Sequence, residues 1–126
     1  MNLELRRKAL EVFGWTNMAE CAHGLAGMPP AGTIISASAI CLASPYTEPL
    51  AHAPAIESDS GVALTMLMGF CKARKWLFHL VMDPQGFMVK MFEDTKDSWI
   101  VFRSDYYSST PAEAIARAIV EAGGKK

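Results

Sequence analysis

The chain has 126 residues, which suits one domain, residues 1–126, built around one hydrophobic core. Hydrophobic residues make up 51% and charged residues 20% of the chain, which excludes a disordered or fibrous protein. The formal net charge of −1 gives no overall attraction to nucleic acid or to an anionic membrane. We therefore expect neither as a partner, and any anion site must be local.

Three features predict a cytoplasmic protein. The cysteines Cys21, Cys41 and Cys71 are far apart and form no CxxC pair, which is typical of a reducing compartment. The first residues lack the basic-then-apolar order of a signal peptide. The longest uncharged stretch, residues 21–47, contains several Pro and Gly residues, so it cannot supply the ~20 apolar residues of a membrane-spanning helix.

The first predicted element is a helix over about Leu3–Phe13, with Asn2 as its N-cap. From residue 16 to residue 58 the periodicity weakens, and only Thr33–Leu42 carries enough Ile and Thr to favour extended structure. Long loops without structure of their own are uncommon in compact domains. We interpret residues 16–58 as a long loop or arm within the domain: a binding loop, an oligomer arm, or a segment that contains an edge strand.

A second helix and three strands are predicted next. Ser58–Ser60 caps the helix, whose broad apolar stripe makes it the candidate central helix. Alternating apolar residues predict strands over residues 76–82, 87–92 and 98–103, with a tight turn at residues 83–86. Both faces of these strands are largely apolar, so we expect both to be covered, by helices on each side or by another subunit.

The last predicted element is a helix that begins at a capping box, Thr110-Pro111-Ala112-Glu113, and ends at Gly123-Gly124. The fold class is therefore α+β. It is a three-stranded antiparallel meander with helices packed on it, in the order α-loop-α-β-β-β-α, as a layered sandwich. Six residues should lie in one core between sheet and helices: Phe78, Leu80, Val89, Val101, Ile115 and Ile119.

Three segments carry a family resemblance: residues 9–15 (ALEVFGW), 58–64 (SDSGVAL) and 110–118 (TPAEAIARA). These segments and their order along the chain resemble the phage ABA-sandwich domain family, which consists of small proteins of phages and prophages. The segment between the first two looks longer than is typical for that family, and residues 56–59 replace its tyrosine-bearing helix entry. The resemblance implies a phage-encoded accessory protein and implies no reaction.

The residues do not predict an enzyme. No GxSxG, Walker loop, GxGxxG or HExxH motif occurs, and no pair of carboxylates is placed for acid–base work. His23, His52 and His79 are scattered, so we expect no metal and no cofactor. His79 lies in the middle of a predicted strand, which favours a core or inter-subunit histidine. Cys71 lies on an apolar stripe and is interpreted as buried and inert.

The best candidate site leads from the third strand into the last helix. A helix N-terminus attracts anions, an arginine binds phosphate through two N–H groups, and tyrosine rings stack on nucleobases. The alternative is structural: the threonine caps the helix, the serines solvate the loop, and the tyrosines pack against the first helix. The helix entry at residues 58–61 ranks second, because Asp59 would repel an anion. The candidate ligand-binding residues are Arg103, Ser104, Tyr106, Tyr107, Ser108, Ser109 and Thr110.

Together with the accessory phage protein that the family resemblance implies, these features favour a non-enzymatic protein of the host cell cytoplasm. It would bind a small anionic ligand, such as a cyclic nucleotide or another nucleotide derivative that signals host defence, and sequester it. One alternative is a protein–protein adaptor that acts through the arm at residues 21–47; another is a nucleotide hydrolase. We also expect a homo-oligomer, because the uncharged arm and the two apolar sheet faces would be costly to expose to water.

Overall fold

The computed structural model describes residues 2–21, 24–30, 40–41, 50–94, 99–105 and 107–123. The helices are α1 (Leu3–Val12), α2 (Ser60–Arg74) and α3 (Pro111–Gly123). The strands are β1 (Thr16–Cys21), β2 (Gly24–Met28), β3 (Ile40–Cys41), β4 (Leu50–His52), β5 (Trp76–Asp83), β6 (Gly86–Glu93) and β7 (Ile100–Arg103).

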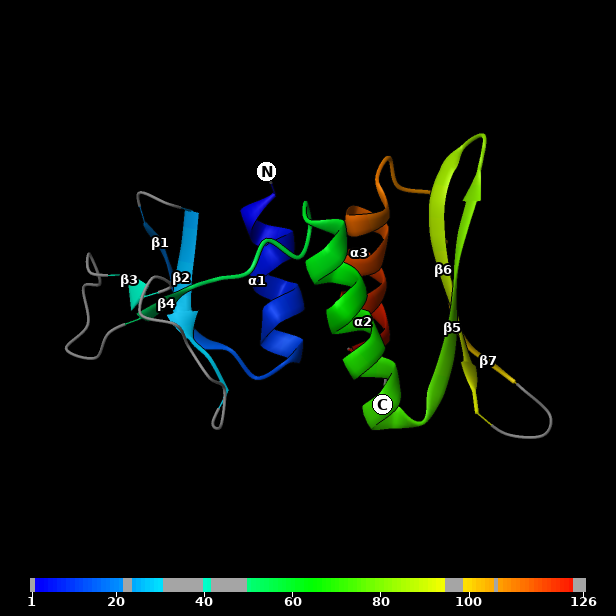
Figure 1. The fold of residues 1–126 in the computed structure, drawn as a ribbon, viewed down its shortest axis with the longest axis horizontal. Helices are drawn as coiled ribbons and strands as arrows, with labels where there is room; N and C mark the ends of the chain where they lie inside the picture. The colour runs from blue at the N-terminus through cyan, green and yellow to red at the C-terminus, as the bar shows by residue number, and fades with distance from the viewer. Residues whose placement is uncertain are drawn as a thin grey trace.

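The helices lie between two antiparallel sheets (Figure 1). One sheet has four strands in the order β1-β2-β4-β3, and α1 packs on its β2 strand. The other has three strands in the order β5-β6-β7, with α2 and α3 packed against it. The α+β class, the three helices and the three-stranded meander agree with the sequence prediction. None of the described helices is long and apolar enough to cross a membrane.

All three helices begin where their capping residues predict. Each cap side chain accepts a hydrogen bond from the backbone N–H three residues further on: Asn2 at 3.0 Å, Asp59 at 3.1 Å and Thr110 at 3.2 Å. Helix α2 ends at Arg74, and its C-cap Lys75 has the left-handed conformation (φ 58°) that commonly closes a helix. Local chemistry therefore fixes these boundaries.

The main core lies between the three-stranded sheet and the helices. Phe78, Val89, Val101, Ile115 and Ile119 belong to it, as predicted. Leu80 does not belong to this core and is 37% exposed. The reason is its place on the edge strand β5, because Val89, directly opposite on the central strand β6, is fully buried (Figure 1).

The segment predicted as a long loop, residues 16–58, instead contributes the four strands of the first sheet. The pattern missed them because β2 reads GLAGM, with no β-branched or aromatic residue. The first sheet and α1 enclose a second small core, made of Leu10, Trp15, Leu25, Ala51 and Ala53. Most of the predicted Thr33–Leu42 extended segment lies outside the described residues, which include only residues 40 and 41 of it, as β3.

The sequence predicts that both faces of the β5–β7 sheet are covered, by helices on each side or by another subunit. Helices on both faces are not found among the described residues, and cover by another subunit stays a prediction. Within the part of the chain that the structure describes, α2 and α3 cover one face only. The opposite face carries exposed apolar residues, including Leu77 (50%) and Ile100 (57%). We call it the outer face, and it holds the site described next.

Candidate functional site

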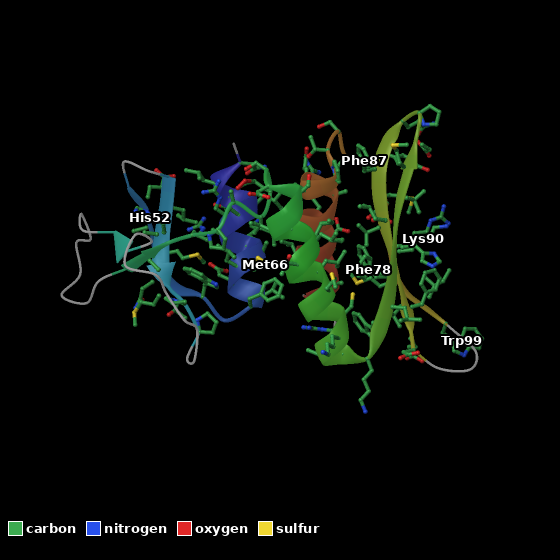
Figure 2. The ribbon with its side chains drawn as sticks, viewed as in Figure 1. His52, Met66, Phe78, Phe87, Lys90 and Trp99 are labelled. Carbon is green, nitrogen blue, oxygen red and sulfur yellow. The ribbon has the colours of Figure 1, made fainter. Side chains whose placement is uncertain are left out.

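The two faces of the β5–β7 sheet carry different side chains. Figure 2 shows Phe78 and Phe87 pointing toward the helices and Lys90 pointing away from them. Successive residues of a strand alternate between faces, and residues directly opposite each other on neighbouring strands share a face. The strand register places His79 opposite Lys90 and Lys90 opposite Arg103. All three side chains therefore lie on the outer face.

His79, Lys90 and Arg103 form a straight row across the three strands, which we call the cationic row. Side chains directly opposite each other on neighbouring strands have Cβ atoms about 5 Å apart. His79 and Arg103 are exposed and Lys90 is partly buried. Among the described residues, no carboxylate pairs with Lys90 or Arg103. Two adjacent like charges repel each other, and a bound anion would remove that repulsion.

An apolar row runs beside the cationic row. Leu77 lies opposite Phe92, and Phe92 lies opposite Ile100. The Phe92 ring packs against the His79 imidazole, with ring centroids 4.8 Å apart and planes tilted by 58°. The outer face thus places flat, apolar surface directly next to positive charge, a combination that binding sites for nucleobases with attached phosphate use.

Tyr107 lies at the other end of this face, next to Gly86. A Cβ atom at Gly86 would stand 3.3 Å from the Tyr107 Cβ and 2.4 Å from the Ser108 carbonyl oxygen, so only glycine fits there. The Tyr107 hydroxyl donates a hydrogen bond to the Asp83 carboxylate, and this bond is the main reason that the pKa of Tyr107 is raised. The Arg103 charge opposes the shift.

The structure separates the predicted site residues into two groups. Arg103 and Tyr107 contribute to the outer face. Ser104 does not, because its hydroxyl is hydrogen-bonded to the backbone of Val89, at 3.1 Å from the nitrogen and 3.3 Å from the oxygen. Ser108 is 5% exposed and forms a backbone bridge to Phe87. Tyr106 lies outside the described residues.

The N-terminus of α3 is occupied by the chain's own side chains. The Ser109 hydroxyl donates to Glu113 Oε2 at 3.2 Å, and Thr110 caps the Glu113 N–H. Arg117 binds the same carboxylate at 2.7 Å. A negative charge therefore already lies at this helix end, where an anion would bind. Asp59 holds the corresponding position at α2, the site ranked second.

The other sequence candidates do not gather into a site. In the described ranges, no three His, Cys, Asp or Glu residues come together to hold a metal. Cys71 is buried, as predicted, and burial raises the pKa of its thiol to about 11, an effect that Arg74 partly offsets. His79 is exposed in the single chain, so the core interpretation was wrong; the inter-subunit interpretation stays a prediction. The arm at residues 21–47 lies largely outside the described residues.

Sequence reasoning missed His79, Lys90 and Phe92 as site residues. The signal was present in the hairpin: a two-residue turn between Asp83 and Gly86 sets the register that aligns His79 with Lys90. What the pattern could not tell was which face the helices leave open.

Comparisons with known proteins add no further assignment. No family model, no curated protein and no solved structure matches this chain. The resemblance to a phage family therefore stays an expectation, and a function can be proposed only from the chemistry of the outer face.

Proposed function

We propose that this protein binds a nucleotide-type anion on the outer face of the β5–β7 sheet and sequesters it. The observation that carries the proposal is the in-register cationic row, His79–Lys90–Arg103, with the Phe92 ring beside it. The proposed site therefore differs from the sequence prediction: it lies on the open sheet face and not in the loop at the start of α3. Arg103 and Tyr107 belong to both sites.

Phosphate is the favoured contact of the cationic row. Arg103 offers a planar pair of N–H donors that matches two phosphate oxygens, and Lys90 supplies a second positive charge on the neighbouring strand. Because the two lie directly opposite each other, one phosphate or diphosphate group can contact both. Each charge-assisted contact contributes about 1.5–3 kcal/mol.

A base is the favoured contact of the apolar row. Leu77, Phe92 and Ile100 form the row of opposite residues next to the cationic row, on the same face of the sheet. Base–aromatic stacking contributes about 1–3 kcal/mol for each base and tolerates any base identity. The site would therefore distinguish nucleotides from inorganic phosphate through stacking, with little preference among bases.

The groups near the cationic row support a proposal of sequestration rather than turnover. A hydrolase needs a general base or a metal beside the scissile bond. Asp83, the carboxylate at the end of β5, already accepts hydrogen bonds from Tyr107 and from the Gln85 N–H, the latter at 2.7 Å. The ligand would be released unchanged. The phage origin, the host-defence ligand and the cytoplasmic location belong to this proposal as the context that the sequence resemblance implies.

Isothermal titration calorimetry with ATP, AMP and inorganic phosphate tests the proposal. We expect ATP to bind more tightly than AMP, and both more tightly than phosphate. Lys90→Gln and Arg103→Gln should each weaken ATP binding about ten- to hundredfold. Phe92→Leu should weaken ATP and AMP while leaving phosphate unchanged.

Lys8→Gln is the matched control, because Lys8 is an exposed lysine on α1, and its loss should leave affinity unchanged. Chromatography of the released nucleotide should return intact ATP. Equal affinity for ATP in the Lys90→Gln, Arg103→Gln and Lys8→Gln variants would rule out the cationic row as the site, and recovery of ADP or AMP would support the hydrolase alternative.

A further inference from the structure

Strand β5 is an open edge. It is the first strand in the order β5-β6-β7 and runs for eight residues, Trp76–Asp83, paired with β6 along its whole length. An edge strand presents a row of unpaired N–H and C=O groups that can template pairing with another chain. Its side away from β6 meets no other described strand.

The hydrogen-bond pattern shows which groups point outward. The Asp94 N–H donates to the Lys75 carbonyl at 2.9 Å, so residues 75 and 94 form a hydrogen-bonded position of the ladder, although the Lys75 N–H itself donates to the Lys72 carbonyl at the end of α2. Such pairs alternate along an antiparallel ladder. Leu77, His79, Val81 and Asp83 consequently bond to β6, while four residues direct their N–H and C=O groups outward: Trp76, Phe78, Leu80 and Met82.

The other strand edges in the described parts are protected and this one is not. Irregular register interrupts β1 between Thr16 and Ala19, β3 has two residues, and β7 has four residues next to a register shift. Short strands, bulges and charges are the usual devices that prevent edge pairing. Strand β5 has no proline, no register shift and no formal charge before Asp83.

The surface beside this edge is apolar on the helix side. A groove of about 520 Å³ runs between α2 and the start of β5, and Met68, Trp76 and Phe78 help to line it. Met68 is 56% exposed. At the far end of the strand, Met82 is 74% exposed and lies on the same face of the sheet as Trp76 and Phe78. One end of the strand thus offers a groove and the other an exposed methionine.

We infer that a second copy of this chain pairs with β5 in the antiparallel direction, around a two-fold axis at His79. In this register Trp76 lies opposite the partner's Met82, and Phe78 lies opposite the partner's Leu80. All four outward-facing residues of each strand then exchange hydrogen bonds. A register centred on Leu80 would place Trp76 opposite Pro84, which has no N–H to donate.

Two further features fit a second copy as the occupant. The exposed Met82 of each chain fills the groove beside Trp76 of the other. Lys75 at one end of the strand comes opposite the partner's Asp83 at the other end, so opposite charges meet twice.

The pairing makes one continuous sheet from the three strands of each copy. Because His79 is the residue at the two-fold axis, the two cationic rows join end to end on the outer face. The dimer requires only the β5 edge and the groove beside it. Its existence therefore does not depend on nucleotide binding, and the two proposals can be tested separately.

Light scattering after size-exclusion chromatography tests the inference at micromolar concentration. The wild-type protein should elute as a particle with twice the chain mass of 13.7 kDa. Met82→Lys should raise the dimer dissociation constant on the order of a hundredfold, because two methionines lose their burial in each dimer. Trp99→Lys is the matched control: Trp99 is 67% exposed but lies next to β7, at the opposite edge, and this variant should remain a dimer.

Hydrogen exchange supplies the second readout. In the wild type, the Phe78 and Leu80 amides should be protected as strongly as those of His79 and Val81. In Met82→Lys they should lose protection while His79 and Val81, bonded to β6, keep theirs, which separates loss of the dimer from unfolding. A monomeric wild type, fast exchange at Phe78 and Leu80 in it, or a Met82→Lys variant that dimerises as well as Trp99→Lys would overturn the inference.

Discussion

Replacement of Glu57 by Gln should strongly destabilise the protein, because Glu57 neutralises a buried arginine. Arg6 in α1 binds Glu57 through Nε and Oε1, and again through Nη2 and Oε2 at 3.3 Å. The side chains are 5% and 2% exposed. The pair joins α1 to the segment before α2, so it connects two parts of the chain that are far apart in the sequence.

The burial sets the size of the effect. Removing one partner of a buried ion pair leaves an uncompensated charge and costs about 3–5 kcal/mol. Gln can still accept one hydrogen bond, so we expect about 3 kcal/mol for Glu57→Gln. For 126 residues the unfolding entropy is about 0.26 kcal/mol per kelvin, so this loss should lower Tm by about 11 °C.

Urea and thermal unfolding followed by circular dichroism measure this. Glu4→Gln is the matched control, because Glu4 pairs with Arg7 on the surface of α1, where both side chains are about half exposed. It should cost at most about 0.5 kcal/mol. The double variant Arg6→Met with Glu57→Leu should recover most of the loss, since it removes both charges. Similar small losses for Glu57→Gln and Glu4→Gln would refute the reasoning.

Three further predictions concern single sites. Gly86→Ala should cost about 1–3 kcal/mol in urea unfolding, because φ is 135° and the new Cβ would meet the Ser108 carbonyl oxygen; an unchanged midpoint would contradict this. Thr110→Ala should cost about 1 kcal/mol through loss of the α3 cap, with nucleotide affinity unchanged; weaker binding would return the ligand to that loop. The Cys71 thiol, with a pKa of about 11 against 9.0, should resist alkylation at pH 8 in peptide-level mass spectrometry. Because the folded state retains this proton longer, Cys71 should lower stability as pH rises from about 9 to about 11, a loss that Cys71→Ala should lack.

Much of the second half of the fold could be predicted from the sequence because its signals are local. The capping box at Thr110 and the turn before Gly86 each act within a few residues, and they gave α3 and the β5–β6 hairpin. The first sheet could not be predicted in this way. Strand β2 pairs with β4, more than twenty residues away, and its small residues carry no strand pattern.

Only part of the candidate site could be predicted from the sequence. Arg103 was identified because it precedes a helix start, and the structure places it on the outer face instead. Its neighbours His79 and Lys90 come from other strands, so their proximity depends on register and on which face the helices cover. Those are tertiary properties, and composition and spacing do not encode them directly.

Ligand binding on the outer face is tested most directly by a map of amide chemical shifts in the ¹⁵N-labelled protein on titration with ATP. We expect the largest changes on the outer face, at His79, Lys90, Phe92 and Arg103, with smaller changes in the first sheet. Changes confined to β1–β4 or to the start of α3, with none at the cationic row, would contradict it.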